Sequence, residues 1–142
     1  MAQQDFDELV EEFALFDDWE ERYRYVIDLG KAMDPLPEAE RSDAHKVEGC
    51  ASQVWIVPEI AGEGPQARLD FRGDSDAMIV RGLIAVLKRL FSGRSLTEAA
   101  EIDAPSELAR LGLHEALSAQ RSNGLKAMVA RLQGLARGRA PA

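Results

Sequence analysis

Cys50 is the one cysteine in the chain, and it stands in Gly49-Cys50-Ala51-Ser52, directly before the apolar run Val54–Val57. A single cysteine forms no disulfide within its own chain, no cysteine-rich metal site and no C-x-x-C redox pair. If the thiol acts, it acts alone, as a nucleophile, a carrier of a group bound to sulfur, or a redox sensor. Gly49 and Ala51 leave the sulfur little shielded, and Gly49 permits the positive φ of a tight exposed turn. The competing interpretation is a buried cysteine that packs as a small hydrophobe.

A thiol hydrolase would also need a base beside the nucleophile. His45 and His114 are the only histidines in the sequence, and neither spacing from Cys50 is diagnostic. His45 is close enough in the chain to approach the thiol and lower its pKa, and its alternative is an ordinary solvated loop histidine. His114 is expected to cap a helix or to pack.

Metal and cofactor sites have little support in the sequence. Positions 45, 50 and 114 show no recognised spacing of metal ligands. Asp74 and Asp76 follow Gly73 and are more typical of a turn and a helix N-cap than of a cation site. Gly62-Glu63-Gly64 is expected between two strands, where no following helix offers its N-terminus to a phosphate. We therefore expect no metal and no cofactor.

Sulfur transfer between proteins matches these residues better than hydrolysis does. The acceptor in such a reaction needs one accessible cysteine, whose thiolate attacks the terminal sulfur of a donor persulfide. Two other classes stay open on the residues alone. The first is a thiol-independent interaction or regulatory domain, and the second is a stand-alone thiol enzyme or redox sensor.

Length and composition indicate an ordinary globular protein. The chain has 142 residues, 46% of them hydrophobic and 30% charged, which predicts a single domain over residues 1–142. The formal charge of −8 argues against nucleic acid or an anionic membrane as the main partner. The most apolar window, residues 77–91, is interrupted by charged side chains, so we expect no membrane span. With no recognisable export signal and an unpaired cysteine, the expected location is the cytoplasm.

The charges are unevenly distributed along the chain. Residues 1–21 hold nine acids and no base, whereas no acid follows Glu115. This asymmetry is consistent with ordinary solvated helix faces. The alternative is a dipolar surface that orients the molecule against a charged protein partner.

Hydrophobic periodicity predicts helices at both ends of the chain and a hairpin between them. Trp19, Tyr23, Val26 and Ile27 are expected on the inner face of the second helix, with Gly30 as its C-terminal cap. Pro58 predicts a strand edge or a bulge. The expected class is α+β, a small antiparallel sheet packed with helices from both chain ends. The expected elements are helices over 5–15, from Asp17 or Asp18 to Gly30, 76–92, 97–102, 105–111 and from Ser118, a loop over 34–46, and strands at Val47, 53–60 and 67–72.

Four segments in register resemble the SufE family of sulfur acceptors in iron–sulfur cluster assembly. The most specific is Val47-Glu48-Gly49-Cys50-Ala51-Ser52-Gln53-Val54-Trp55. The others are Trp19–Tyr23 leading to Ile27–Gly30, Gly73–Asp76 running into Ile79–Ala85, and Leu117–Leu125 with Met128. The chain departs from the family at Arg81, where a lysine is common, and at Ala119-Gln120, where Pro-Ser is common. Both departures are expected to affect a surface and not the thiol.

The resemblance implies a fold shared with NifU-type and IscU-type scaffold domains. It implies that Cys50 accepts sulfur as a persulfide from the desulfurase SufS, stimulating that enzyme, and passes it to the SufBCD scaffold complex. The protein would then be an accessory carrier, and the pyridoxal phosphate would belong to SufS. A relative, CsdE, serves another desulfurase with nearly the same motif, so the motif does not fix the donor. A homodimer stays open. The expected partner-binding or loop-supporting residues are His45, Gly49, Ser52, Asp74, Asp76 and Arg121.

Overall fold

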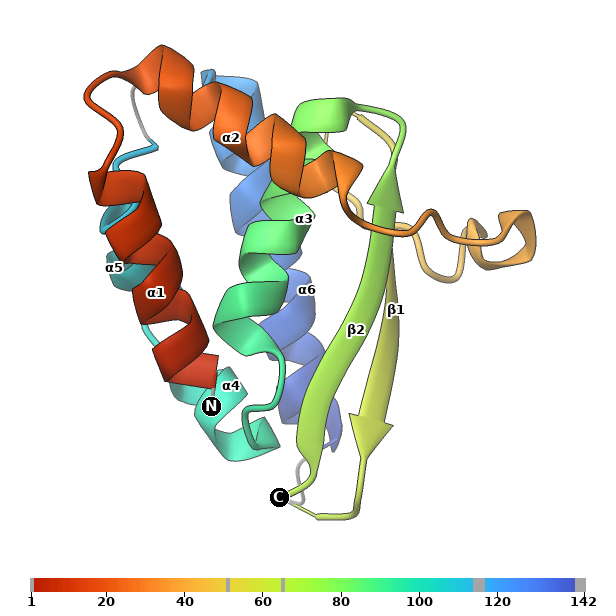
Figure 1. Cartoon of the computed structure of the whole chain (residues 1–142). Coiled ribbons are helices and arrows are strands. Elements are labelled where there is room, and N and C mark those ends of the chain that lie inside the picture. Colours follow the sequence, from red (N-terminus) through yellow and green to blue (C-terminus); the bar gives the residue numbers. More distant parts are fainter. Residues whose placement is uncertain (1, 51, 65, 114–116, 140–142) are drawn as a thin grey trace.

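Two strands pair into an antiparallel hairpin, and helices from both ends of the chain pack beside it, which confirms the predicted α+β class (Figure 1). The computed structural model describes residues 2–50, 52–64, 66–113 and 117–139, so the expectations for Ala51 and His114 lie outside the described residues. The elements are α1 (Ala2–Ala14), α2 (Trp19–Lys31), the 3-10 turn η1 (Glu38–Glu40), β1 (Val54–Ala61), β2 (Arg68–Ser75), α3 (Met78–Phe91), α4 (Leu96–Glu101), α5 (Ala104–Ala109) and α6 (Ala119–Arg139).

The hairpin keeps one continuous register, from Val54 opposite Ser75 to Ala61 opposite Arg68. The predicted alternation of β2 is confirmed, because Leu69 and Phe71 are buried while the side chains between and before them are exposed. β2 is longer than predicted and includes Gly73 and Asp74, which the sequence had suggested for a turn. The strand needs a glycine at position 73, because a Cβ there would lie 2.7 Å from the Ile84 side chain of α3.

A short extended segment at residues 45–47 pairs with the other edge of β1. The Val47 N–H donates to the Val54 carbonyl at 2.8 Å, and the Ile56 N–H donates to the His45 carbonyl at 2.9 Å. The predicted strand at Val47 is thus reduced to an isolated bridge, which pairs Lys46 with Trp55. Pro58 lies beyond it, opposite Phe71 in an unbroken ladder, so it stands at a strand edge and not in a bulge.

Helices α2 and α3 cross with their backbones in contact, and glycines make this approach possible. A Cβ on Gly82 would lie 2.0 Å from the Val26 carbonyl oxygen, and one on Gly30 would lie 2.6 Å from the Gly82 nitrogen. The prediction of Gly30 as a C-terminal cap is therefore wrong, since Gly30 lies inside α2 and Ala32 is the cap residue. Gly30 instead serves the helix crossing, a tertiary contact that a sequence pattern for helix ends does not reveal.

The start of α2 departs from expectation in one respect. Asp18 caps the helix, and its carboxylate accepts a hydrogen bond from the Glu21 N–H at 2.9 Å, as the spacing predicted. Trp19, however, is not buried as expected, because 47% of the residue is exposed at the open end of the face that it shares with Tyr23. It occupies the first position of the helix, where the chain turns in from α1.

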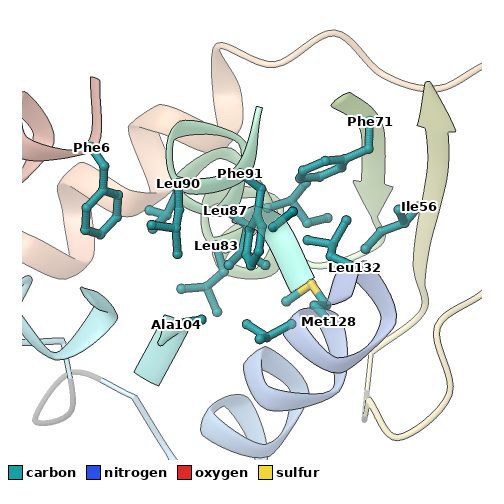
Figure 2. Packing of buried hydrophobic residues seen from close by; sticks show 14 of the residues in the cluster. Phe6, Ile56, Phe71, Leu83, Leu87, Leu90, Phe91, Ala104, Met128 and Leu132 are labelled. Atoms are coloured by element: carbon teal, nitrogen blue, oxygen red, sulfur yellow. The ribbon is translucent and has the colours of Figure 1, made fainter. Parts of the chain in front are cut away.

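The core gathers around α3, which lies between α1 and the hairpin in Figure 1. Figure 2 shows Leu83, Leu87, Leu90 and Phe91 of α3 among side chains from the other elements. Phe6 of α1, Phe71 and Ile56 of the hairpin, Ala104 of α5 and Met128 and Leu132 of α6 complete the labelled part of this cluster. Among the described residues, no helix is both long and apolar enough to cross a bilayer.

Candidate functional site: the Cys50 thiol and its cavity

Cys50 lies between Val47 and Val54, and we call the described residues of this segment, 48–50 with 52 and 53, the thiol loop. The Val47–Val54 backbone hydrogen bond closes its base. Gln53 is held to the end of β2, because its carbonyl accepts from the Ser75 hydroxyl at 2.7 Å and its N–H donates to the Asp76 carboxylate at 3.1 Å. Asp76 thus fastens the loop to the residues before α3 and has no contact of its own with the thiol among those described.

Gly49 gives the thiol loop its tight turn. Its φ is +91°, in the region that favours glycine, and this confirms the backbone conformation expected from the sequence. A Cβ at this position would also lie 3.3 Å from the Ala127 Cβ of α6. The turn therefore brings Cys50 directly against the beginning of α6.

The Cys50 thiol is half-buried and points at a helix carbonyl. Its Sγ lies 3.6 Å from the Gly124 carbonyl oxygen of α6, so the thiol donates a weak hydrogen bond. Gly124 carries no side chain that would separate the two elements, and a Cβ there would lie 3.7 Å from Sγ. Local sequence pattern does not reveal this partner, since its only sign is a glycine inside a helical segment.

A cavity of about 200 Å³ adjoins the thiol. Cys50 and Ser52 line it from the thiol loop, and Arg121 lines it from α6, so the structure brings these three predicted site residues together. The other members of the lining were not predicted as site residues, and Gln120, whose departure from the family was expected to affect a surface and not the thiol, is one of them, so that expectation is wrong for Gln120. These other members are Val80, Leu83, Ser118, Gln120, Gly124 and Met128.

Burial and charge hold the thiol in its neutral form. Desolvation is the larger cause that raises the pKa of Cys50, and the Glu48 carboxylate is the second. The hydrogen bond to the Gly124 carbonyl acts in the same direction, because it uses the proton that the thiolate would lack. At rest, the sulfur is therefore poorly prepared for attack, since the thiolate is the nucleophile.

Arg121 connects the cavity to α2. Its guanidinium carbon lies 6.0 Å from the centre of the Tyr23 ring, within the range of a cation–π contact. The Ser118 hydroxyl accepts from the Arg121 N–H at 3.2 Å, which confirms Ser118 as the N-cap residue of α6. Arg121 thus stands at the first turn of α6, between the thiol cavity and the aromatic face of α2.

Asp74 lies away from the cavity, at the root of the loop of residues 34–46, which we call the anchored loop. Its carboxylate is fully buried and accepts from the Leu36 N–H at 2.9 Å and from Arg41 at 2.7 Å, and it also pairs with Arg81. Burial alone would raise the pKa of this carboxyl, but the Leu36 and Ser75 N–H groups and the two arginines outweigh it and lower the pKa. Asp74 is therefore an ionised anchor.

Arg81 was expected to affect only a surface, and this expectation is wrong. Besides Asp74, its guanidinium donates to the Gly30 carbonyl at 3.2 Å and to the Met33 carbonyl at 2.6 Å. It thereby joins α3, the end of α2 and Asp74 of β2 in one polar cluster. The planar guanidinium suits such divergent acceptors, which a lysine would satisfy less fully.

His45 belongs to the anchored loop and not to the thiol. Its Nδ1 lies 3.0 Å from the Glu40 carbonyl oxygen and 3.4 Å from the Ser42 hydroxyl. No hydrogen bond joins His45 to Cys50 in the described part of the chain. The imidazole therefore supports the loop locally through Glu40 and Ser42.

A larger hollow of about 550 Å³ lies between α5 and α6, and among the described residues it shares no lining residue with the thiol cavity. Its walls are mainly apolar, with Leu108, Leu125 and Val129 among them. Among its described lining residues there is no cysteine, histidine or carboxylate, whereas the smaller cavity is lined by Cys50. The smaller cavity beside Cys50 is therefore the better candidate for chemistry.

Comparison with known proteins identifies the family and the fold. The model of the SufE family, described as an Fe–S metabolism associated domain, matches residues 7–136. An uncharacterized SufE-like protein of Rhizobium meliloti (strain 1021) is 48% identical over 136 residues, covering 96% of this chain and 97% of the relative. Another, from Rhizobium etli, is 48% identical over 136 residues, covering 96% of this chain and 92% of the relative.

Among solved structures, the solution structure of a hypothetical protein from Thermus thermophilus shares the fold. Its TM-score is 0.70, its sequence is 23% identical, and the match covers 95% of each chain. The family model spans most of the chain, and the relatives match nearly end to end. The chain belongs to the SufE family, whose domain is associated with iron–sulfur metabolism.

Proposed function

We propose that this protein carries sulfur on Cys50, accepting it as a persulfide from a SufS-type cysteine desulfurase and delivering it to a SufBCD-type scaffold for iron–sulfur cluster assembly. Membership of a family associated with iron–sulfur metabolism supports a role in sulfur transfer. The observation that carries the proposal is the single half-buried thiol that opens onto its own cavity at the end of a closed loop. The expected setting is a reducing cytoplasm, where an unpaired thiol persists.

The transfer step is an exchange at sulfur. The Cys50 thiolate attacks the terminal sulfur of the donor's cysteine persulfide, and a new S–S bond forms on Cys50 while the donor's S–S bond breaks. The electron pair of the broken bond leaves with the donor's cysteine as its thiolate. The terminal sulfur passes from the donor to Cys50 without a net oxidant or reductant, so this protein needs to supply only a nucleophilic sulfur. Removing the sulfur would free the donor for another turnover.

The cavity is large enough to receive the added sulfur. Its volume of about 200 Å³ is several times the share of ~30 Å³ that a water molecule has in the liquid. A persulfide on Cys50 could therefore turn inward between Ser52 and Arg121 instead of pointing into solvent. Shelter matters because an exposed sulfur species is open to reductants and oxidants.

The raised pKa of Cys50 implies that the donor must activate the thiol. On docking, Sγ has to leave the Gly124 carbonyl and reach a site where it loses its proton. The thiol loop is fastened at Gln53 and at the Val47–Val54 contact, whereas the Cys50 thiol makes a weak hydrogen bond, so we expect docking to displace Sγ while both ends of the loop stay in place. In the proposed order of events, the Cys50 thiol is protonated and unreactive at rest and becomes a reactive thiolate in the complex with the donor.

The test is to mix the purified protein with a SufS-type desulfurase and cysteine and to measure its intact mass. We expect the mass of one or more sulfur atoms to be gained by the wild type and lost on treatment with a reductant. Cys50→Ser should gain none and should no longer stimulate alanine formation, because serine lacks the readily ionised sulfur. Its free energy of unfolding should stay within about 1 kcal/mol of the wild type.

Three results would contradict the proposal. A Cys50→Ser protein that stimulates the desulfurase fully would indicate a thiol-independent regulatory domain. A wild-type protein that gains no sulfur beside an active desulfurase would remove the carrier role. A reaction of the thiol that proceeds with no partner present would instead favour a stand-alone thiol enzyme or sensor.

A further inference from the structure

The turn between α1 and α2 exposes two large apolar side chains close together in the chain. Leu15 is 79% exposed and Trp19 is 47% exposed. In the described part of the chain, Met78 is the only other large apolar side chain that is exposed. An exposed tryptophan is costly to leave in water and is a residue type that often contributes most of the binding energy at protein interfaces.

Acidic side chains surround these two residues. Asp17, Asp18, Glu20 and Glu21 are all exposed, and none of them forms an ion pair within the residues that the structure describes. The Asp18 carboxylate accepts from the Glu21 backbone N–H at the helix cap, which leaves the carboxylates of Asp17, Glu20 and Glu21 as the freer charges in this part of the described chain. We call the set Leu15, Asp17, Asp18, Trp19, Glu20 and Glu21 the corner surface.

The corner surface continues toward the thiol cavity along one face of α2. Trp19 and Tyr23 are one helical turn apart, so they share a face. The Tyr23 ring lies 6.0 Å from the Arg121 guanidinium, and Arg121 lines the cavity beside Cys50. Figure 1 shows the first turns of α6 passing behind α2. A protein that covers the mouth of the cavity at Arg121 can therefore extend onto Tyr23 and Trp19.

We propose that the corner surface is a docking site for the sulfur donor, which places Trp19 in an apolar pocket rimmed by lysine or arginine. The inference rests on the proposed function, which requires a protein to sit over Cys50. The charge of the corner surface specifies the complementary charge of that partner. A second copy of this chain, related by a twofold axis through the corner surface, would bring acid against acid, so self-association fits less well.

The test measures binding and sulfur transfer separately. A purified SufS-type desulfurase from the same organism is titrated calorimetrically with the wild type and with Trp19→Ala, and the dissociation constant of each complex is determined. We expect Trp19→Ala to weaken binding roughly tenfold or more. At saturating concentration, the variant should still gain sulfur in the intact mass, because Cys50 and its cavity are unchanged. Trp19→Phe should recover part of the affinity.

A matched pair of double variants tests the acidic rim. Asp17→Asn with Glu20→Gln removes two charges from the corner surface, and Glu38→Gln with Glu63→Gln removes two exposed charges elsewhere. We expect the first pair to weaken binding roughly threefold or more at low salt and the second to leave it within about twofold. A higher salt concentration should reduce the difference in affinity between the two double variants, since screening weakens the interactions of exposed charges. Unfolding curves are measured as a control, to check that all variants are folded.

The outcomes separate this inference from the proposed function. If the wild type binds and gains sulfur while Trp19→Ala binds equally well, the corner surface is not the docking site and the carrier role stands. If the wild type gains no sulfur at all, the carrier role itself fails. If Trp19→Ala instead abolishes a dimer of this protein and leaves donor binding unchanged, the occupant is a second copy and the inference is overturned.

Discussion

The two loops that flank the start of β1 are held in opposite ways. The anchored loop has the buried Asp74 carboxylate at its root, a two-point pair between Arg72 and Glu40, and Arg131 bonded to the Ala44 carbonyl. The thiol loop is fastened at its base, and in the described part of it the tip has one weak contact, from the Cys50 thiol to a carbonyl 3.6 Å away. The strong polar contacts therefore hold the anchored loop, next to the thiol loop in the chain, and do not involve the Cys50 thiol itself.

This contrast indicates how a single sulfur can be both sheltered and deliverable. Charged hydrogen bonds in a buried site resist opening, whereas a thiol is a weak donor that exchanges its partner at little cost. In the proposed carrier role, α3 and α6 provide walls of the cavity, and the Cys50 thiol is held to them by a weak hydrogen bond. The comparison can be tested by damaging each loop in turn.

The largest effect is expected at the anchored loop. Asp74→Ala would leave the Arg81 guanidinium buried without its carboxylate, and losing one member of a buried pair costs about 3–5 kcal/mol. Urea unfolding monitored by circular dichroism measures this loss. In the folded variant, the alkylation rate of Cys50 should change little, because none of the described contacts of Asp74 reaches the thiol. A rate that rises as strongly as the stability falls would show that the two loops are coupled.

Acid should reproduce part of that loss in the wild type. Folding lowers the pKa of Asp74, so its ionised form stabilises the folded state at pH values above the ordinary pKa of a carboxyl. That contribution disappears as the pH falls through the lowered value in the folded protein. The free energy of unfolding of Asp74→Asn should consequently depend less on pH in this acidic range than that of the wild type.

A smaller effect is expected from Gly49→Ala in the thiol loop. A side chain at φ +91° is strained by about 1–3 kcal/mol, and its Cβ would crowd Ala127. We expect the loop to shift and Cys50 to alkylate faster at unchanged pH. Gly93→Ala is the matched control, because φ is +88° there and no atom lies within 4 Å of an added Cβ. Equal alkylation rates in both variants would argue that Gly49 does not position the thiol.

The smallest effect is expected from Glu48→Gln. This change removes the second cause of the raised pKa of Cys50 and leaves the larger one, burial, in place. The midpoint of alkylation against pH should move down toward the ordinary range of a thiol, and the rate near neutral pH should rise roughly twofold to threefold. A midpoint that does not move would mean that solvent screens Glu48 completely from the sulfur.

Much of the architecture was predictable from local patterns. The alternation of β2, the Asp18 cap and the periodicity of α3 each depend on residues close in sequence, so each can be identified without knowledge of the rest of the chain. Gly30 and Trp19 were predicted wrongly because their environments depend on residues that are far away in the sequence. Whether a glycine ends a helix or lets two helices touch, and which face of α2 is covered, depends on elements that are distant in the sequence.

The sequence by itself determined the chemical inventory, a single cysteine in a glycine turn before a strand, and the family motif around it. Only the tertiary structure decided what surrounds the sulfur. The Gly124 carbonyl, Arg121 and Met128 come from a helix far along the chain, and His45 turns away to bind Glu40. Desolvation and cavity shape arise from contacts between distant segments, and these contacts set the protonation and the shelter of the thiol.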